Sequence, residues 1–481
     1  MPAFRGYPRF ALHAGLAFAA VIAVLVARSA GWLNPEVQLG LDWACRLYVA
    51  YRIASARVSL AYLLLWLPLA WLLPELTALV IFLFGGRKHG ALAAAKKEVN
   101  RVAWRIGDEP VTTGNRFRLL GDRHGRDTLD ALRAQILAAR CRIHISTYIL
   151  SNDAVGREII SLLARRVREG LEVRLLLDSV GSWGAPLTLC RPLRRAGGRI
   201  AFFNPAMPLQ GKGSANWRNH RKIAVFDGRT AIIGGQNLGL RYMGNDPSNR
   251  RFRDCSFLIE GPSAAGLERV FIADWCQATD ENPHAFASIL RERPVAQGEV
   301  EVEVVASGPD CATDPLWEHY VRLFSGAKRS ITIVTPYFIP DRVLFSLLIT
   351  AAHAGRRVRL LVPRRSDHRL LDFARRWYLR TLRDAGAEIL FFKPDVLHAK
   401  LVIVDDEQLV AGSANLDMRS LFLNYEIGTI IRDENALREV RGFIANLEAE
   451  SASYSEDLYR RSRTWNGRMV ETISKVLAPM L

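Results

Sequence analysis

The sequence predicts an α/β protein built from two similar units that follow a pair of hydrophobic helices. Three observations support this prediction. The order strand, helix, strand occurs twice in the part of the chain with mixed composition. One spacing of histidine, lysine, aspartate and asparagine also occurs twice, beginning at His220 and at His398. Two long apolar stretches precede both copies, within the first 90 residues.

The two units are recognised by segments that match in order and in sequence. Each unit has a strand, then an amphipathic helix that ends at a glycine, then a second strand: 141–150, 155–170 and 171–179, repeated as 329–341, 342–355 and 356–367. This order predicts mostly parallel sheets covered by helices. We expect the units to span residues 112–295 and 296–481 and to pack about a pseudo-twofold axis, which would bring both histidine motifs to one cleft.

The N-terminal 90 residues are expected to form a membrane anchor, joined to the first unit by a linker at 91–111. Residues 10–27 contain one histidine and no charged residue, and residues 58–84 carry a single charge. Both stretches reach the length needed for a spanning helix, so they predict a transmembrane helical hairpin. A cleaved signal peptide is the alternative for the first stretch, but the second stretch favours the hairpin.

Charge and cysteine content constrain the partners and the compartment. The chain has 481 residues and a formal net charge of +17, which favours anionic partners such as a nucleic acid or an acidic membrane surface. Basic residues that follow the second apolar stretch favour the cytoplasm for the downstream units. The six cysteines form no CxxC pair and the histidines form no HxxxH pattern, so the sequence gives no support for a metal site.

The repeated motif places a reactive set of side chains at equal intervals. Its members are His220, Lys222, Asp227 and Asn237 in the first unit, and His398, Lys400, Asp405 and Asn415 in the second. Side chains alternate along a strand, so each histidine and its lysine point to the same side. The aspartate marks a turn, and the returning strand is expected to bring the asparagine back towards the histidine and lysine.

Two such faces that meet would suit a phosphodiester. Lysines and asparagine amides would hold the non-bridging oxygens, while one neutral histidine attacks phosphorus and the other, protonated, donates to the leaving oxygen. The two histidines would therefore need opposite protonation states, which predicts a coupled titration. We expect the aspartates Asp227 and Asp405 to belong to the catalytic set chiefly as structural supports.

The motifs resemble the paired HxKxxxxD motifs of the phospholipase D superfamily. The segments NHRKIAVFDGRTAIIGGQNLG, TPYFIPD, LHAKLVIVDD and GSANLDMRSLFLNYEI, with the hydrophobic N-terminus, are similar to bacterial cardiolipin synthases over nearly the whole chain. The resemblance implies transfer of a phosphatidyl group between two phosphatidylglycerol molecules, without a metal or cofactor. It also implies a carboxylate behind each histidine. By position, Asp254 would partner His220 and Glu426 would partner His398, with His220 as the nucleophile.

Other functions and details stay open at this point. The motifs alone also fit a phospholipase D that uses water or another alcohol, a nuclease, or a membrane scaffold without activity. The apolar stretches argue against a nucleic acid partner because they place the site beside lipid. The expected location is the bacterial inner membrane, with a multi-pass anchor. Phosphatidylethanolamine remains a possible second lipid substrate, and the oligomeric state is not predicted.

Overall fold

The structure is a computed structural model in which the chain divides into two units. One unit combines Met1–His89 with Asn204–Arg218, and the other combines Gly90–Phe203 with Asn219–Leu481. Each unit is described by itself below. The structure describes residues 27, 30–32, 34–54, 60–84, 96, 111–183, 188–204, 216–244, 251–394 and 396–454.

In the N-terminal unit, the described residues include the helices α2 (Pro35–Ala54), α3 (Leu60–Leu72) and α4 (Pro74–Phe84). The chain bends at Leu73 between α3 and α4, because the residue before a proline is disfavoured in the helical conformation. The predicted span at 58–84 is therefore two short helices in the structure. None of the helices in the described part of the chain has both the length and the apolar character that a membrane crossing requires. The predicted span at 10–27 lies outside the described residues, except for its last residue.

The larger unit consists of two halves whose elements correspond in order. In the first half, the elements are β1 (Val111–Leu120), α6 (Arg126–Ala138), β2 (Arg142–Thr147), α7 (Ala154–Arg168), β3 (Glu172–Asp178), α8 (Arg191–Arg195), β4 (Arg199–Phe203), β5 (Ile223–Phe226), β6 (Thr230–Gly234), β7 (Phe252–Arg253), β8 (Ser256–Glu260), α9 (Pro262–Thr279), η1 (Pro283–Phe286) and α10 (Ala287–Leu290). In the second half, they are β9 (Val300–Ser307), α11 (Pro315–Gly326), β10 (Ser330–Val334), β11 (Phe338–Ile339), α12 (Arg342–His353), β12 (Arg357–Pro363), α13 (Arg369–Asp384), β13 (Glu388–Phe392), β14 (Val396–Leu397), β15 (Leu401–Val404), β16 (Gln408–Gly412), β17 (Leu416–Asp417), α14 (Met418–Phe422), β18 (Glu426–Ile431), α15 (Glu434–Ala449) and β19 (Ser451–Ser453).

The strand–helix–strand segments predicted from the sequence are present in both halves. α7 begins after Asp153, whose carboxylate accepts a hydrogen bond from the backbone N–H of Gly156. α12 begins in the same way after Asp341, which caps the N–H groups of Val343 and Leu344. The strands that flank these helices are almost fully buried, although β2 and β10 carry polar residues such as His144 and Thr332 on one face.

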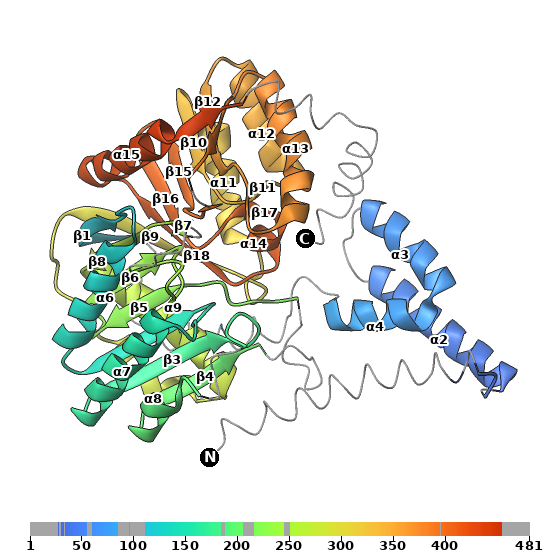
Figure 1. Cartoon of the computed structure of the whole chain (residues 1–481), viewed down its shortest axis with the longest axis horizontal. Helices are drawn as coiled ribbons and strands as arrows, with labels where there is room; N and C mark the ends of the chain where they lie inside the picture. The colour runs from blue at the N-terminus through green and yellow to red at the C-terminus, as the bar shows by residue number, and fades with distance from the viewer. Residues whose placement is uncertain are drawn as a thin grey trace. The chain divides into compact units, whose positions relative to one another are not determined.

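One continuous sheet runs through both halves, and its strand order is nearly the same when it is read from either end. The order among the described strands is β19-β13-β12-β10-β15-β16-β18-β9-β1-β8-β6-β5-β2-β3-β4. Except for the extra edge strand β19, each strand has a counterpart at the mirrored place. The antiparallel pair β9 and β1 joins the halves at the centre of the sheet (Figure 1).

The expectation of a mostly parallel sheet is wrong. Among the described strands of this sheet, β2, β3 and β4 run parallel, as do β10, β12 and β13, whereas the other pairs are antiparallel. The difference arises because each histidine motif continues into a hairpin, and a hairpin can only add antiparallel strands. A shared apolar core packs residues of both halves together, including Phe257 and Ile427.

Candidate active site

Each histidine motif lies at the start of a hairpin, as the sequence predicts. β5 pairs with β6 and β15 pairs with β16 in antiparallel register, and both hairpins close at an aspartate with a left-handed backbone. Asp227 and Asp405 adopt φ angles of 54° and 57° at these turns. The histidine and the lysine precede the first strand of each hairpin, so both pairs lie at the end away from the turn.

The backbone of each histidine is bound to the opposite half of the protein. The N–H of His220 donates to the carbonyl of Tyr425 at 2.9 Å, and the N–H of His398 donates to the carbonyl of Arg253 at 2.8 Å. The short strands β7 and β14 pair next to the second of these contacts. Each motif is thus fixed by the segment of the other half that carries an acidic residue immediately afterwards.

Those two acidic residues orient the histidines across the halves. Nδ1 of His220 lies 3.0 Å from Oε1 of Glu426, and Nδ1 of His398 lies 2.6 Å from Oδ2 of Asp254. The prediction that Asp254 partners His220 and Glu426 partners His398 is therefore wrong. It fails because it assigned partners by closeness in the chain, whereas the backbone pairing brings each acidic segment to the opposite motif. The contact points Nε2 of each imidazole away from its carboxylate, and Nζ of Lys400 lies 3.3 Å from Nε2 of His398.

The two carboxylates are held by different neighbours. Ser413 donates to Glu426 at 2.5 Å, and the side chain of Asn424 donates to its other oxygen at 3.2 Å. Asp254 instead accepts the backbone N–H of Cys255 at 2.8 Å. Gly235, which corresponds to Ser413 in the motif, allows Asp254 to approach because a Cβ at this position would overlap its carboxylate. The two halves thus place a carboxylate in the same way, but the groups that hold this carboxylate differ between them.

Burial and the neighbouring charges control the protonation of the site. Burial lowers the pKa of His398 to about 4, and Lys400 adds to the shift. Burial likewise lowers the pKa of His220, and Lys400 of the other motif contributes, although Glu426 acts in the opposite direction. Both imidazoles therefore favour the neutral form, whereas the sequence argument expects one to be protonated. A phosphodiester anion between them would favour the protonated form of the acid.

The acidic partners stay ionised although they are buried. Burial by itself would raise the pKa of the Asp254 carboxyl, but Lys400 and His398 together hold it below the ordinary value. The same balance applies to Glu426, where His220 and Lys222 lower the pKa against the effect of burial. An ionised carboxylate fixes the proton on Nδ1 of its histidine and so presents an unprotonated Nε2.

The lysines lie beside their histidines, as predicted, and both are almost fully buried. Nζ of Lys222 donates to the carbonyl oxygen of His220 at 2.6 Å, and Lys400 donates in the same way to His398. Burial lowers the pKa of Lys222 to about 7 and also lowers that of Lys400. An anion in the site would restore the charge of both ammonium groups, which makes them suited to binding phosphate oxygens.

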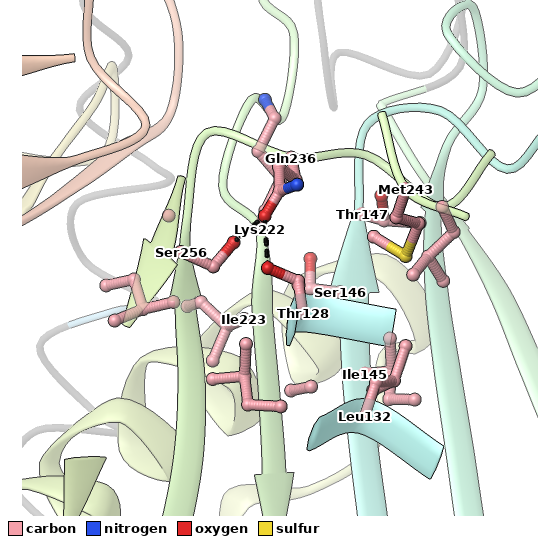
Figure 2. A pocket seen from close by; sticks show the side chains of 15 residues that line it. Thr128, Leu132, Ile145, Ser146, Thr147, Lys222, Ile223, Gln236, Met243 and Ser256 are labelled. Atoms are coloured by element: carbon pink, nitrogen blue, oxygen red, sulfur yellow. Dashed lines mark hydrogen bonds between the residues drawn. The ribbon is translucent and has the colours of Figure 1, made fainter. Parts of the chain in front are cut away.

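A small cavity borders Lys222. It has a volume of about 30 Å³ and lies among side chains of α6, β2, β5, β6 and β8. Figure 2 shows that Gln236 accepts hydrogen bonds from Thr128 and Ser256 at its polar rim, at 2.5 and 2.8 Å. The rest of the lining is mainly apolar, with Ile145 and Leu132 among its members. The stem of Lys222 therefore passes through a medium in which charge is disfavoured.

The side chains of the two asparagines, Asn237 and Asn415, make different contacts. Oδ1 of Asn237 accepts the backbone N–H of Ile149 at 3.1 Å, and its side chain also bonds to Tyr242. The ring of Tyr242 packs edge-on against His398, with centroids 5.5 Å apart, so Asn237 reaches the motif of the other half. Asn415 is buried and bonds to Asp417. The structure thus brings both amides to the region of the histidines.

Comparison with known proteins agrees with this geometry. A family model described as "Cardiolipin synthase, PLD-like domain" matches the chain at residues 132–275 and again at 320–447. The chain belongs to the cardiolipin synthase family. A cardiolipin synthase of Geobacillus kaustophilus is 32% identical over 81% of this chain and 77% of its own length. The major cardiolipin synthase ClsA of Bacillus subtilis is 33% identical over 74% of each chain.

A solved structure shows that the fold is shared more widely. The crystal structure of a phosphatidylserine synthase from Haemophilus influenzae matches with a TM-score of 0.60 and 16% identity, over 80% of this chain and all of that chain. At this level of identity the likeness concerns the fold. The mixed α/β architecture with phospholipase D-like domains is thus confirmed for this member of the cardiolipin synthase family.

The aspartates of the two motifs lie far from the histidines in this member of the cardiolipin synthase family. Asp227 accepts the backbone N–H groups of Arg140, Cys141 and Arg142 at 2.7 to 2.9 Å. Asp405 accepts the three equivalent groups at the start of β10, at 2.6 to 2.9 Å. Each aspartate follows its histidine by seven positions of mostly extended chain, which corresponds to about 20 Å. Their contacts are those of structural residues, which agrees with their expected role as supports and not with direct catalysis.

Replacing Asp405 by asparagine is therefore expected to affect stability more than turnover. The variant loses the charge that binds three backbone N–H groups. Its free energy of unfolding should therefore be about 1–3 kcal/mol lower than that of the unchanged protein. Asparagine tolerates the left-handed backbone of the turn, so the variant should still fold. Urea unfolding measures the effect on stability, and the turnover number per folded molecule measures the effect on catalysis. The exposed Glu407→Gln change serves as a control, and a loss of turnover above about tenfold in Asp405→Asn would contradict the structural role.

Sequence reasoning missed one buried residue that links the halves at this site. Arg221 stands between His220 and Lys222 and is fully buried. Its Nε donates to the carbonyl of Glu426 at 3.0 Å, and its other nitrogens reach Ser307 and Asp274. The sequence offered one sign of this role: an arginine stands between the histidine and the lysine of the first motif, where the second motif has Ala399. Among the described residues, no cluster of histidine, cysteine and acidic side chains could hold a metal ion.

Proposed function

We propose that this chain transfers the phosphatidyl group of one phosphatidylglycerol to a free hydroxyl of a second, which gives cardiolipin and glycerol. Membership of the cardiolipin synthase family supports phosphatidyl transfer with cardiolipin as the product. The observation that carries the mechanism is the crossed pair of contacts, His220 with Glu426 and His398 with Asp254. Two oriented imidazoles, each paired with an ionised carboxylate, suit a two-step displacement at phosphorus.

In the first step, Nε2 of His220 attacks phosphorus while the bond from phosphorus to the glycerol oxygen breaks. His398 donates its proton to that oxygen, so neutral glycerol leaves and the phosphatidyl group remains on His220. In the second step, His398 takes the proton of the acceptor hydroxyl, whose oxygen attacks phosphorus and releases His220. Lys222 and Lys400 are proposed to bind the non-bridging oxygens, and Asn237 and Asn415 to support this binding.

We further propose that residues 1–90 anchor the enzyme in the bacterial inner membrane as a multi-pass hairpin, with the catalytic halves in the cytoplasm. The apolar residues Trp43, Leu47 and Tyr51 support a lipid contact, because they are exposed one helical turn apart on α2. Residues 91–111 would act as a linker before two domains at 112–295 and 296–481. The nearly palindromic strand order supports a pseudo-twofold axis between these domains.

Purified enzyme that receives phosphatidylglycerol as its only lipid tests the proposed reaction. We expect cardiolipin and glycerol in equal amounts, because each transfer releases one head group. Mass spectrometry of the lipids and an enzymatic glycerol assay measure both products. Phosphatidic acid as the main product would instead indicate hydrolysis by a phospholipase D. Addition of phosphatidylethanolamine tests a second lipid substrate, since free ethanolamine would then appear.

A further inference from the structure

The second half carries a polar cluster beside its histidine that the proposed chemistry does not use. The hydroxyl of Tyr337 donates to Oδ1 of Asp367 at 2.5 Å, and the ring of His368 packs edge-on against Tyr337 at 5.6 Å. Tyr337 is only 9% exposed, whereas about a third of the Asp367 side chain is exposed. The tyrosine thus holds a carboxylate that still faces the solvent.

The backbone places this cluster at the active site. β11 pairs with β17 so that Phe338 lies opposite Leu416, and Tyr337 and Asn415 are the residues that directly precede this pair in the two parallel strands. Burial and the Asp367 carboxylate both raise the pKa of Tyr337. The charge of Asp367 also acts on Tyr242, the residue whose ring packs against His398. The cluster therefore lies on the His398 side of the site.

The first half has no equivalent carboxylate at the corresponding position. Asp367 follows the last residue of β12 by four positions, and Ser182 follows the last residue of β3 by the same interval. Ser182 is buried and bonds to the backbone of Tyr148 and Leu150, so it belongs to the fold of its loop. The first half has an aspartate of its own, Asp178, at the end of β3, but this carboxylate is buried and accepts the backbone N–H groups of Val180, Gly181 and Asn219. Asp367 is the partly exposed carboxylate of the two, which indicates that the two sides bind different parts of the substrates.

We propose that Asp367, held in place by Tyr337, binds the free hydroxyls of the glycerol head group. This inference rests on the proposed function, in which His398 exchanges its proton with the alcohol that leaves or enters. The remaining hydroxyls of that alcohol lie a few bonds from the reacting oxygen, and an ionised carboxylate can accept a hydrogen bond from each. A neutral polyol fits better than an ammonium head group, because it adds no positive charge beside Lys400.

Exchange of radiolabelled glycerol into phosphatidylglycerol tests this assignment in the full chain. We expect Asp367→Asn to raise the KM for glycerol about 10- to 100-fold, the loss that follows when a charged hydrogen bond is removed. Tyr337→Phe should raise it less, because the carboxylate remains but loses its support. Release of nitrophenol from a nitrophenyl ester of phosphatidic acid, without added glycerol, should change less than about threefold in both variants, since this donor carries no glycerol hydroxyls and its leaving group needs no proton. Asp384→Asn, at the opposite end of α13, is the matched control and should behave as the unchanged enzyme.

The outcomes separate this inference from the proposed function. If the unchanged enzyme makes cardiolipin but the KM for glycerol is the same in Asp367→Asn, only the head-group site is wrong. Equal losses of glycerol exchange and of nitrophenol release would reduce Asp367 to a structural residue. A raised KM for glycerol in Asp384→Asn would show that the effect is not specific to Asp367. Ethanolamine that outcompetes glycerol in the unchanged enzyme but not in Asp367→Asn would overturn the polyol assignment. An unchanged enzyme that releases no glycerol from phosphatidylglycerol would instead end the proposed function.

Discussion

Replacing His220 by asparagine is expected to abolish both phosphatidyl transfer and the covalent intermediate. The amide keeps the size of the imidazole but offers no nucleophilic nitrogen, so activity should fall by about 10⁴-fold or more. Replacing His398 should abolish transfer from phosphatidylglycerol equally, because its glycerol oxygen needs a proton to leave. A substrate with a nitrophenol leaving group needs no such proton, so His398→Asn should still form the intermediate with it.

Enzyme that has reacted with a ³²P-labelled nitrophenyl phosphodiester and is then quenched in alkaline detergent distinguishes the two histidines, because the bond between phosphorus and the imidazole nitrogen survives alkali but not acid. Label should be retained by His398→Asn, where the second step is blocked, and should be absent from His220→Asn. The opposite pattern would exchange the two roles without changing the reaction. Label in neither variant, with the unchanged enzyme labelled, would contradict a division into nucleophile and acid. The exposed His284→Asn change is a control for nonspecific labelling.

Loss of the carboxylates that orient the two histidines is expected to have the second largest effect on turnover. Glu426→Gln and Asp254→Asn should each lower turnover by about 10²- to 10⁴-fold, because the amide no longer fixes the proton on Nδ1 of its histidine. In the labelling assay, Glu426→Gln should impair formation of the intermediate, as His220→Asn does. Asp254→Asn should impair its breakdown, as His398→Asn does.

Double variants identify which residues act together. Glu426→Gln should add little to His220→Asn, and Asp254→Asn should add little to His398→Asn, because each pair acts as a unit. Non-additive effects between Asp254 and His220 would instead favour the partners first expected from their positions in the chain. Glu434→Gln, which changes an exposed carboxylate of α15, controls for the loss of one negative charge.

The sequence predicted the parts of the site that depend on local structure. Spacing along a strand and the turn at each aspartate correctly predicted that His220 and Lys222 lie beside each other, at the open end of a hairpin. Matching segments predicted the repeated strand–helix–strand order. These features depend on neighbours in the chain, which a periodic pattern records directly.

Features that depend on distant contacts were predicted poorly. The partners of the histidines were exchanged, because the pairing of β7 with β14 across the halves leaves no local pattern. The proportion of parallel strands was overestimated for a similar reason, since the direction of a strand after a hairpin follows from the whole sheet. Arg221 was overlooked because a single basic residue just before an apolar strand gives no sign of its buried partners in the other half.

The carboxylates that cross between the halves also bear on how such a protein can evolve. A single copy of the unit would hold a histidine without the acid that orients it, so it would be incompetent unless a second copy supplied that acid. The duplication within one gene makes this mutual dependence permanent and allows the copies to specialise. Selection on this enzyme therefore acts on the matched pair, and a swap of one copy between relatives would succeed only where both surfaces remain compatible.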